Sequence, residues 1–121
     1  MTLDDFSGFC AALPATTLVV QWGGAHVWKV GGKVFAIAAQ GDGDGSAVTF
    51  KCSATAFENL KELPGSRPAP YLASRGMTWI QRRDDQTMDD QGLRDYLRES
   101  HRLVVAKLPK RLRAGLANHS A

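Results

Sequence analysis

The chain has 121 residues, 44% of them hydrophobic and 22% charged, with a formal net charge of +3. This length corresponds to one domain, and the composition is that of an ordinary globular protein rather than a disordered chain. No apolar run approaches the ~20 residues that a membrane span needs. The acidic start Met1–Asp5 lacks the features of a signal peptide. Cys10 and Cys52 show no Cys-x-x-Cys spacing, so we expect two reduced thiols in a cytoplasmic protein.

The first half of the chain predicts one helix followed by four strands. Apolar residues within 3–13 recur at helical spacing, Thr2 can cap this helix, and Pro14 ends it. Gly31-Gly32 lies between two apolar runs and indicates a tight hairpin, because such turns need positive φ at both central residues. The expected strands are Thr16–Trp22, Ala25–Val30, Lys33–Ala39 and Ala47–Cys52.

The second half predicts fewer elements. These are a helix from the Ser53 cap to about Leu63, a proline-rich segment over 66–72 that is either loop or extended chain, a strand over Gly76–Arg83, and a long helix from Asp89 or Asp90. A basic tail follows Pro109. We therefore expect residues 1–121 to form a single two-layer α+β sandwich. Its antiparallel sheet of about five strands carries helices on one face, in the order α-β-β-β-β-α-β-α.

Positive charge is concentrated in the second half of the chain. Residues 1–60 carry a net charge of −2, and residues 61–121 carry +5. Lys and Arg side chains that neutralise phosphates release condensed counterions, so this asymmetry makes a polyanion partner conceivable. Solubility alone is the other interpretation of the same asymmetry.

Recognisable catalytic chemistry is missing from the sequence. His26, His101 and His119 lie in no motif with a serine or cysteine nucleophile, and no metal-binding spacing is present. The pairs Asp84-Asp85 and Asp89-Asp90 are typical of caps and turns. We therefore expect no catalytic residues, no metal and no cofactor, and a monomeric binding module rather than an enzyme.

Several short motifs resemble a known family when they are taken in order. They are Trp22-Gly23, Trp28-Lys29-Val30-Gly31-Gly32-Lys33-Val34-Phe35-Ala36, Phe50-Lys51, Pro70-Tyr71-Leu72, Trp79-Ile80, and Leu97 with Ser100. This set resembles the MmcQ/YjbR family of small bacterial proteins. His101 departs from the tyrosine that often follows the family's serine. The resemblance implies a fold akin to frataxin and secretion chaperones, and a DNA-binding role.

We expect the DNA to be held by phosphate-backbone contacts from basic strand ends and the tail. The candidate residues are Lys51, Arg75, Arg82, Arg83, Lys110, Arg111 and Arg113. For Arg75, Arg82 and Arg83, a solvated strand edge remains the alternative interpretation. Lys33 and Lys51 could instead pair with carboxylates or lie along the sheet. We expect Trp79 to lie in the core, because a tryptophan buries a large apolar area.

A protein- or peptide-binding adaptor is the competing hypothesis. It would use the exposed face of the sheet, in the manner of secretion chaperones, with Trp22, Trp28 and Tyr71 as aromatic anchors. It predicts an exposed apolar patch, whereas the DNA hypothesis predicts one continuous positive face.

Overall fold

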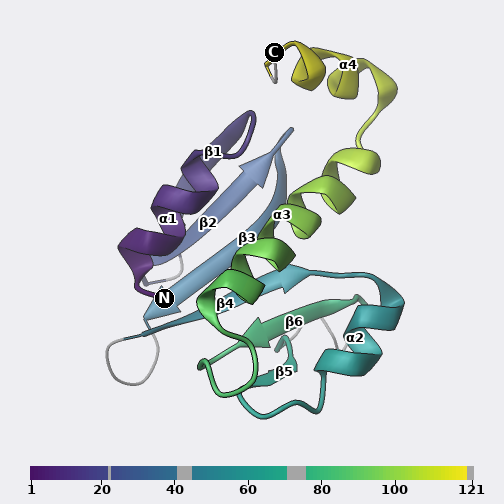
Figure 1. Ribbon diagram of the computed structural model, residues 1–121. Coiled ribbons are helices and arrows are strands. Elements are labelled where there is room, and N and C mark those ends of the chain that lie inside the picture. Colours follow the sequence, from purple (N-terminus) through teal and green to yellow (C-terminus); the bar gives the residue numbers. More distant parts are fainter. Residues whose placement is uncertain (22, 41–44, 71–75, 120–121) are drawn as a thin grey trace.

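The computed structural model describes residues 1–21, 23–40, 45–70 and 76–119 (Figure 1). Its elements are α1 (Leu3–Ala11), β1 (Thr16–Gln21), β2 (Ala25–Val30), β3 (Lys33–Gln40), β4 (Ser46–Lys51), α2 (Ala54–Leu60), β5 (Ser66–Pro68), β6 (Trp79–Arg82), α3 (Asp90–Ala106) and α4 (Lys110–His119). None of the helices in these ranges is long and apolar enough to cross a membrane.

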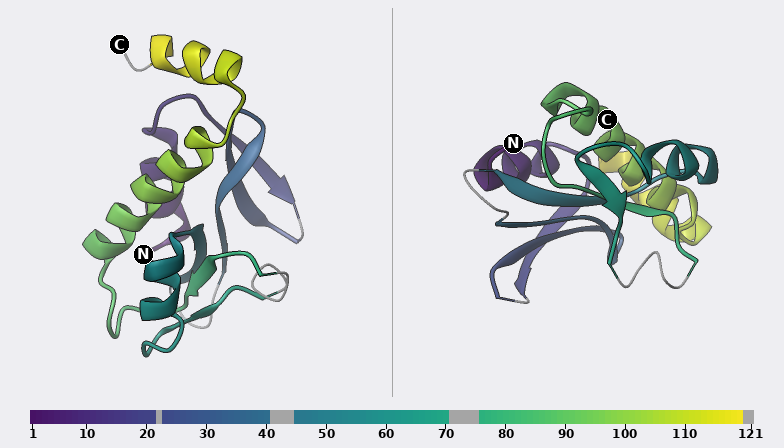
Figure 2. Two further views of the ribbon diagram at one scale, coloured as in Figure 1. Left: turned by 90° about the vertical axis from the view of Figure 1, so that its right-hand side faces the viewer. Right: turned by 90° about the horizontal axis from the view of Figure 1, so that it is seen from below.

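The strands form one antiparallel sheet in the order β1-β2-β3-β4-β6-β5. Helices α1 and α3 lie side by side on one face of it, with the strands beneath them (Figure 2). The expected two-layer α+β architecture is confirmed. Because β1 and β5 are the edges, the centre of the sheet is formed by β3 and β4.

The core lies between the two helices and the sheet. Cross-strand partners point to the same face, and the register places Trp28, Ala36, Phe50 and Ile80 in one row under the helices. All four are buried, and the Phe50 ring stacks on Tyr96 of α3 with ring centroids 5.3 Å apart. From α1 the core receives Phe6 and Cys10, and from α3 Leu93, Leu97 and Val104.

Local sequence signals account for the ends of α1 and for the hairpin. The Thr2 hydroxyl accepts a bond from the Asp5 backbone N–H, and the Asp5 carboxylate accepts one from the Thr2 N–H, which completes a capping box. Gly31 and Gly32 have φ of 58° and 79°, so the predicted tight turn between β2 and β3 is confirmed.

Two elements differ from the expectation. The proline-rich segment contains β5, which pairs with β6 and gives the sheet a sixth strand. Pro68 is tolerated there because β5 is an edge strand, where a missing N–H costs no ladder bond. The segment after Pro109 forms helix α4 rather than an unstructured tail. Pro109 can precede its first turn because the first helical N–H groups need no partner within the helix.

Both cysteines are free and buried. Burial raises the pKa of Cys10 to about 12 and that of Cys52 to about 11, because the thiolate loses its hydration in an apolar environment. Both thiols therefore stay protonated at neutral pH and serve as small core side chains.

Candidate functional site

A cavity of about 420 Å³ opens at one end of the sheet. It lies where β3 begins, β4 ends and β6 begins, and the last turn of α3 with the residues after it forms one wall. Three lysines and six apolar side chains line it: Lys33, Lys51 and Lys107, with Val34, Ile37, Met77, Trp79, Val104 and Leu108. We call this the lysine-rimmed cavity.

The wall of the cavity depends on a glycine turn. A Cβ atom at Gly31 would lie 2.6 Å from Cδ1 of Leu108, which is too close for two carbon atoms. Leu108 therefore reaches this position because residue 31 has no side chain. The turn that joins β2 to β3 thus also seats the C-terminal end of α3 and brings Lys107 to the rim of the cavity.

The three lysines of the rim have no acidic counterparts in the part of the chain that the structure describes. None of them forms an ion pair there, although five other ion pairs occur elsewhere. Burial, followed by the nearby positive charge of Lys107, lowers the pKa of Lys51. Two lysine side chains therefore line the same apolar cavity close to each other, an arrangement that attracts an anion.

Ser100 of α3 fixes the backbone that carries Lys51. In the register of β3 and β4, the next pair after Ala36 and Phe50 would be Phe35 and Lys51. There the Ser100 hydroxyl takes the place of a direct bond: it donates to the Phe35 carbonyl over 2.6 Å and accepts from the Lys51 N–H over 2.9 Å. The serine is fully buried. It therefore ties α3 to two strands beside the cavity.

Trp79 is buried, as the sequence predicts, but on the face of the sheet opposite the helices. Its neighbour Ile80 shares the helix-covered face with Phe50, and side chains alternate along a strand. Among the described residues, the Trp79 Nε1–H is a buried polar group without a hydrogen-bond partner. An unpaired buried donor is uncommon in folded proteins, and here it belongs to a residue that lines a cavity.

Arg82 does not take the predicted role, and the expectation that it contacts phosphate is wrong. Its side chain is only 1% exposed, because it pairs with Val48 on the helix-covered face. It donates two bonds to the Met88 carbonyl, at 3.1 and 2.9 Å, and one to Asp90 at 2.9 Å.

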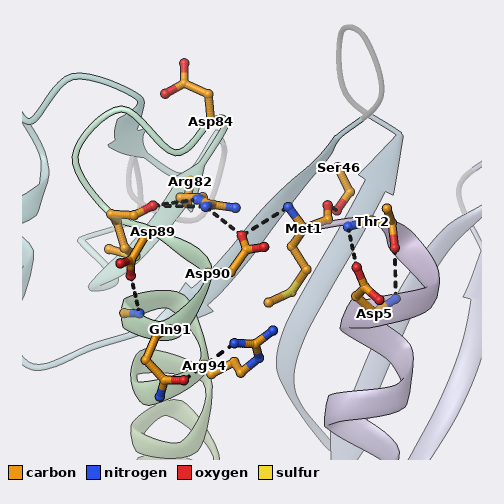
Figure 3. A network of polar contacts seen from close by, with 12 residues as sticks. Met1, Thr2, Asp5, Ser46, Arg82, Asp84, Asp89, Asp90, Gln91 and Arg94 are labelled. Atoms are coloured by element: carbon orange, nitrogen blue, oxygen red, sulfur yellow. Dashed lines mark hydrogen bonds and ion pairs between the residues drawn. The ribbon is translucent and has the colours of Figure 1, made fainter.

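Figure 3 shows this network together with the Met1 ammonium, which lies 3.1 Å from the same Asp90 oxygen. Burial alone would raise the pKa of Asp90. The bonds from the Met1 ammonium and from Arg82 outweigh that effect and hold the pKa below its ordinary value. The network therefore fastens the start of α3 to the end of β6.

The remaining predicted cations fall into two groups. Lys51 lies at the cavity, beside Lys107. The exposed Lys110, Arg111 and Arg113 lie on α4, which follows the C-terminal end of α3 (Figure 1). Arg83 is exposed beside Asp84 at the other end of α3, about 25 Å away along its 17 residues. Arg75 lies outside the described residues, as do two predicted anchors, Trp22 and Tyr71. The prediction that Trp28 is the third anchor is wrong, because this side chain is buried under α1.

Lys107 is a cavity residue that sequence reasoning did not single out. It directly precedes the buried Leu108, and no acidic residue occurs anywhere in 100–121. That acid-free stretch was the available signal, but only the fold brings Lys107 beside Lys33 and Lys51.

The structure also brings Ser7 and His26 together, which no motif indicated. The Ser7 hydroxyl lies 2.6 Å from Nδ1 of His26 and accepts a bond from the Trp28 indole. Neither residue lines the lysine-rimmed cavity. Among the described residues, no group of three or more His, Cys, Asp or Glu side chains lies together in a way that would hold a metal ion.

A six-stranded antiparallel sheet with helices on one face and a cationic cavity at one end defines a small two-layer α+β domain. The chain belongs to the YjbR family, whose model matches residues 11–103. The fold is also that of the crystal structure of the Deinococcus radiodurans protein DR2400, described as a DUF419 domain. That structure has a TM-score of 0.80 and 24% sequence identity, and the match covers 96% of this chain and 88% of that one. No curated protein matches the chain.

Proposed function

We propose that this domain is a non-catalytic module that binds DNA through its phosphate backbone. The observation that carries the proposal is a cluster of unpaired cations at one end of the molecule, which we call the cationic end. Its members are Lys33, Lys51, Lys107, Lys110, Arg111 and Arg113. In the described part of the chain, no carboxylate forms an ion pair with any of them. Such a cluster attracts a polyanion and releases its counterions on contact.

The cationic end is smaller than the positive face expected from the sequence. Arg82 is buried and occupied, and Arg83 lies at the other end of α3, so neither contributes. Two exposed arginines of α3 are also engaged: Arg98 pairs with Asp95, and Arg102 with Glu99. A surface of this composition favours contacts to phosphates over reading of base edges.

The salt dependence of duplex binding tests the proposal. We would titrate the full chain into short labelled duplex DNA by fluorescence anisotropy over a series of salt concentrations. A Lys110→Gln/Arg111→Gln variant should lower the slope of log affinity against log salt by about 0.9 for each phosphate that the variant no longer neutralises. The matched control, Arg98→Gln/Arg102→Gln, removes the same charge from paired positions and should leave the slope unchanged.

Two results would overturn the proposal. The first is the absence of duplex binding by the full chain at low ionic strength. The second is an equal effect of the two double variants, since the interaction would then follow net charge and not the cationic end.

A peptide-binding role remains the alternative, and one observation favours it. Leu18, Val19 and Val20 are 42%, 37% and 56% exposed on β1, an edge strand. An open edge with exposed apolar side chains can accept an extended peptide as an additional strand. Binding of this kind would persist at high salt and would be abolished by Val20→Lys, whereas the phosphate contacts would not be affected by that change.

A further inference from the structure

The lysine-rimmed cavity has the composition of a ligand-binding site rather than that of a shallow surface depression. Its walls are almost entirely apolar, although it opens to solvent. Met77, at 42% exposure, is among the most exposed large hydrophobic residues of the described chain, and it lies on this cavity. Its thioether is flexible and adapts to the shape of an apolar partner. A ligand with an apolar body would remove this surface from water.

The unpaired indole N–H of Trp79 is a second, independent observation. Trp79 is 5% exposed, and a tryptophan indole can only donate. A buried donor without an acceptor is destabilising, so such groups are normally paired with protein or solvent atoms. The nitrogen atom itself is covered, so the part of Trp79 that lines the cavity is its apolar ring surface. This wall of the cavity therefore combines aromatic surface with an unsatisfied donor.

The rim supplies the third requirement. Lys107 lies close enough to contribute to the lowered pKa of Lys51, and Lys33 lines the same cavity. The backbone from which the Lys51 side chain extends is fixed by Ser100. Repulsion between these like charges would be relieved by one anionic group placed between them. Neutral polar or cationic ligands would gain nothing from this arrangement.

We infer that the lysine-rimmed cavity binds a small amphipathic anion. Its apolar body, aliphatic or aromatic, lies against Ile37 and Trp79, and its carboxylate or phosphate lies between Lys51 and Lys107. A cavity of about 420 Å³ falls within the ordinary range of small-molecule sites. The inference concerns the cavity and does not rest on the proposed DNA binding.

Nuclear magnetic resonance of the full chain tests this directly, because the indole N–H of each tryptophan gives its own signal. The probes are octanoate and phenyl phosphate, which distinguish a carboxylate from a phosphate. Octanol and octylamine keep the apolar body of octanoate but carry no charge or the opposite charge. The Trp79 signal is assigned from the Trp79→Phe variant, or by sequential assignment of the unmodified chain if that variant does not fold.

We expect at least one of the two anions to shift the Trp79 indole signal with a saturable Kd. Octanoate should bind at least about tenfold more tightly than octanol, and octylamine more weakly still, because charge separates these otherwise similar ligands. Lys51→Gln/Lys107→Gln should weaken the anion about tenfold and leave octanol binding unchanged. The matched control is Lys110→Gln/Arg111→Gln, which removes the same charge outside the cavity lining and should bind the anions as the unmodified chain does.

The inference is overturned if neither anion shifts the Trp79 signal, if octanol binds as tightly as octanoate, or if the Lys51/Lys107 variant binds the anion normally. These outcomes are separate from the fate of the DNA proposal. No nucleic acid is present in this assay, and the Lys110/Arg111 variant is expected to lose affinity for DNA while keeping the small anion.

Discussion

Replacing Ser100 by alanine removes one hydroxyl from a fully buried position between α3, β3 and β4. It leaves the Lys51 N–H and the Phe35 carbonyl without the atom that joins them. A buried backbone group that loses its partner costs about 1–3 kcal/mol, so the two groups together should lower the free energy of unfolding by about 2–6 kcal/mol. That is a large part of the 5–15 kcal/mol or so that is typical of a domain.

Ser46→Ala is the matched control for this change. Ser46 is also buried, and its hydroxyl donates to the Met1 carbonyl over 3.0 Å. That carbonyl keeps the Ser46 backbone N–H, at 3.1 Å, after the hydroxyl is removed. Loss of one bond without an orphaned group should cost about 1 kcal/mol.

Urea unfolding followed by circular dichroism measures both variants. If Ser100→Ala costs no more than Ser46→Ala, the strands close the gap by a direct backbone bond. The bridging role of the hydroxyl would then be refuted.

Three further changes test other parts of the structure. Arg82→Met should lower the free energy of unfolding by about 3 kcal/mol, the lower end for a broken buried pair because Asp90 is partly exposed; a loss under about 1 kcal/mol would contradict this. The lowered pKa of Asp90 stabilises the fold above about pH 4, and this contribution disappears as the pH falls through the folded-state pKa. Asp90→Asn should therefore lose less stability than the unmodified chain between neutral and acidic pH, as measured by urea titrations. Gly31→Ala should destabilise by about 2–3 kcal/mol and Gly32→Ala by about 1 kcal/mol in thermal unfolding, because both have positive φ but only Gly31 meets Leu108.

Elements that depend on local signals could be predicted from the sequence. The capping box of α1 and the glycine turn between β2 and β3 involve neighbouring residues, so their patterns are visible without the fold. Strand β5 could not be predicted in the same way. Its three residues become a strand only because β6 is beside them, and a proline among them argues against a strand in isolation.

The candidate site shows the same division. Lys51 belongs to a short motif that the sequence shows, but Lys107 is distant from it in sequence and lies beside it because α3 packs on the sheet, with Leu108 against Gly31. The prediction that Arg82 contacts phosphate is wrong because it followed the residue type, whereas strand alternation places Arg82 on the same face as Ile80. Where residue type and periodicity disagreed, periodicity was the better guide to burial.

The cavity and the cationic end share Lys33, Lys51 and Lys107, and this overlap has an energetic consequence. An anion bound between two of these ammonium groups neutralises charge that a phosphate backbone would otherwise contact. By linkage, a duplex that occupies the rim must weaken the small anion by the same factor as the anion weakens the duplex. The duplex titration repeated with saturating octanoate should therefore show weaker binding and a shallower salt slope. If the slope is unchanged although octanoate is bound, DNA is held by α4 alone, and the three lysines of the rim belong to the cavity and not to a polyanion surface.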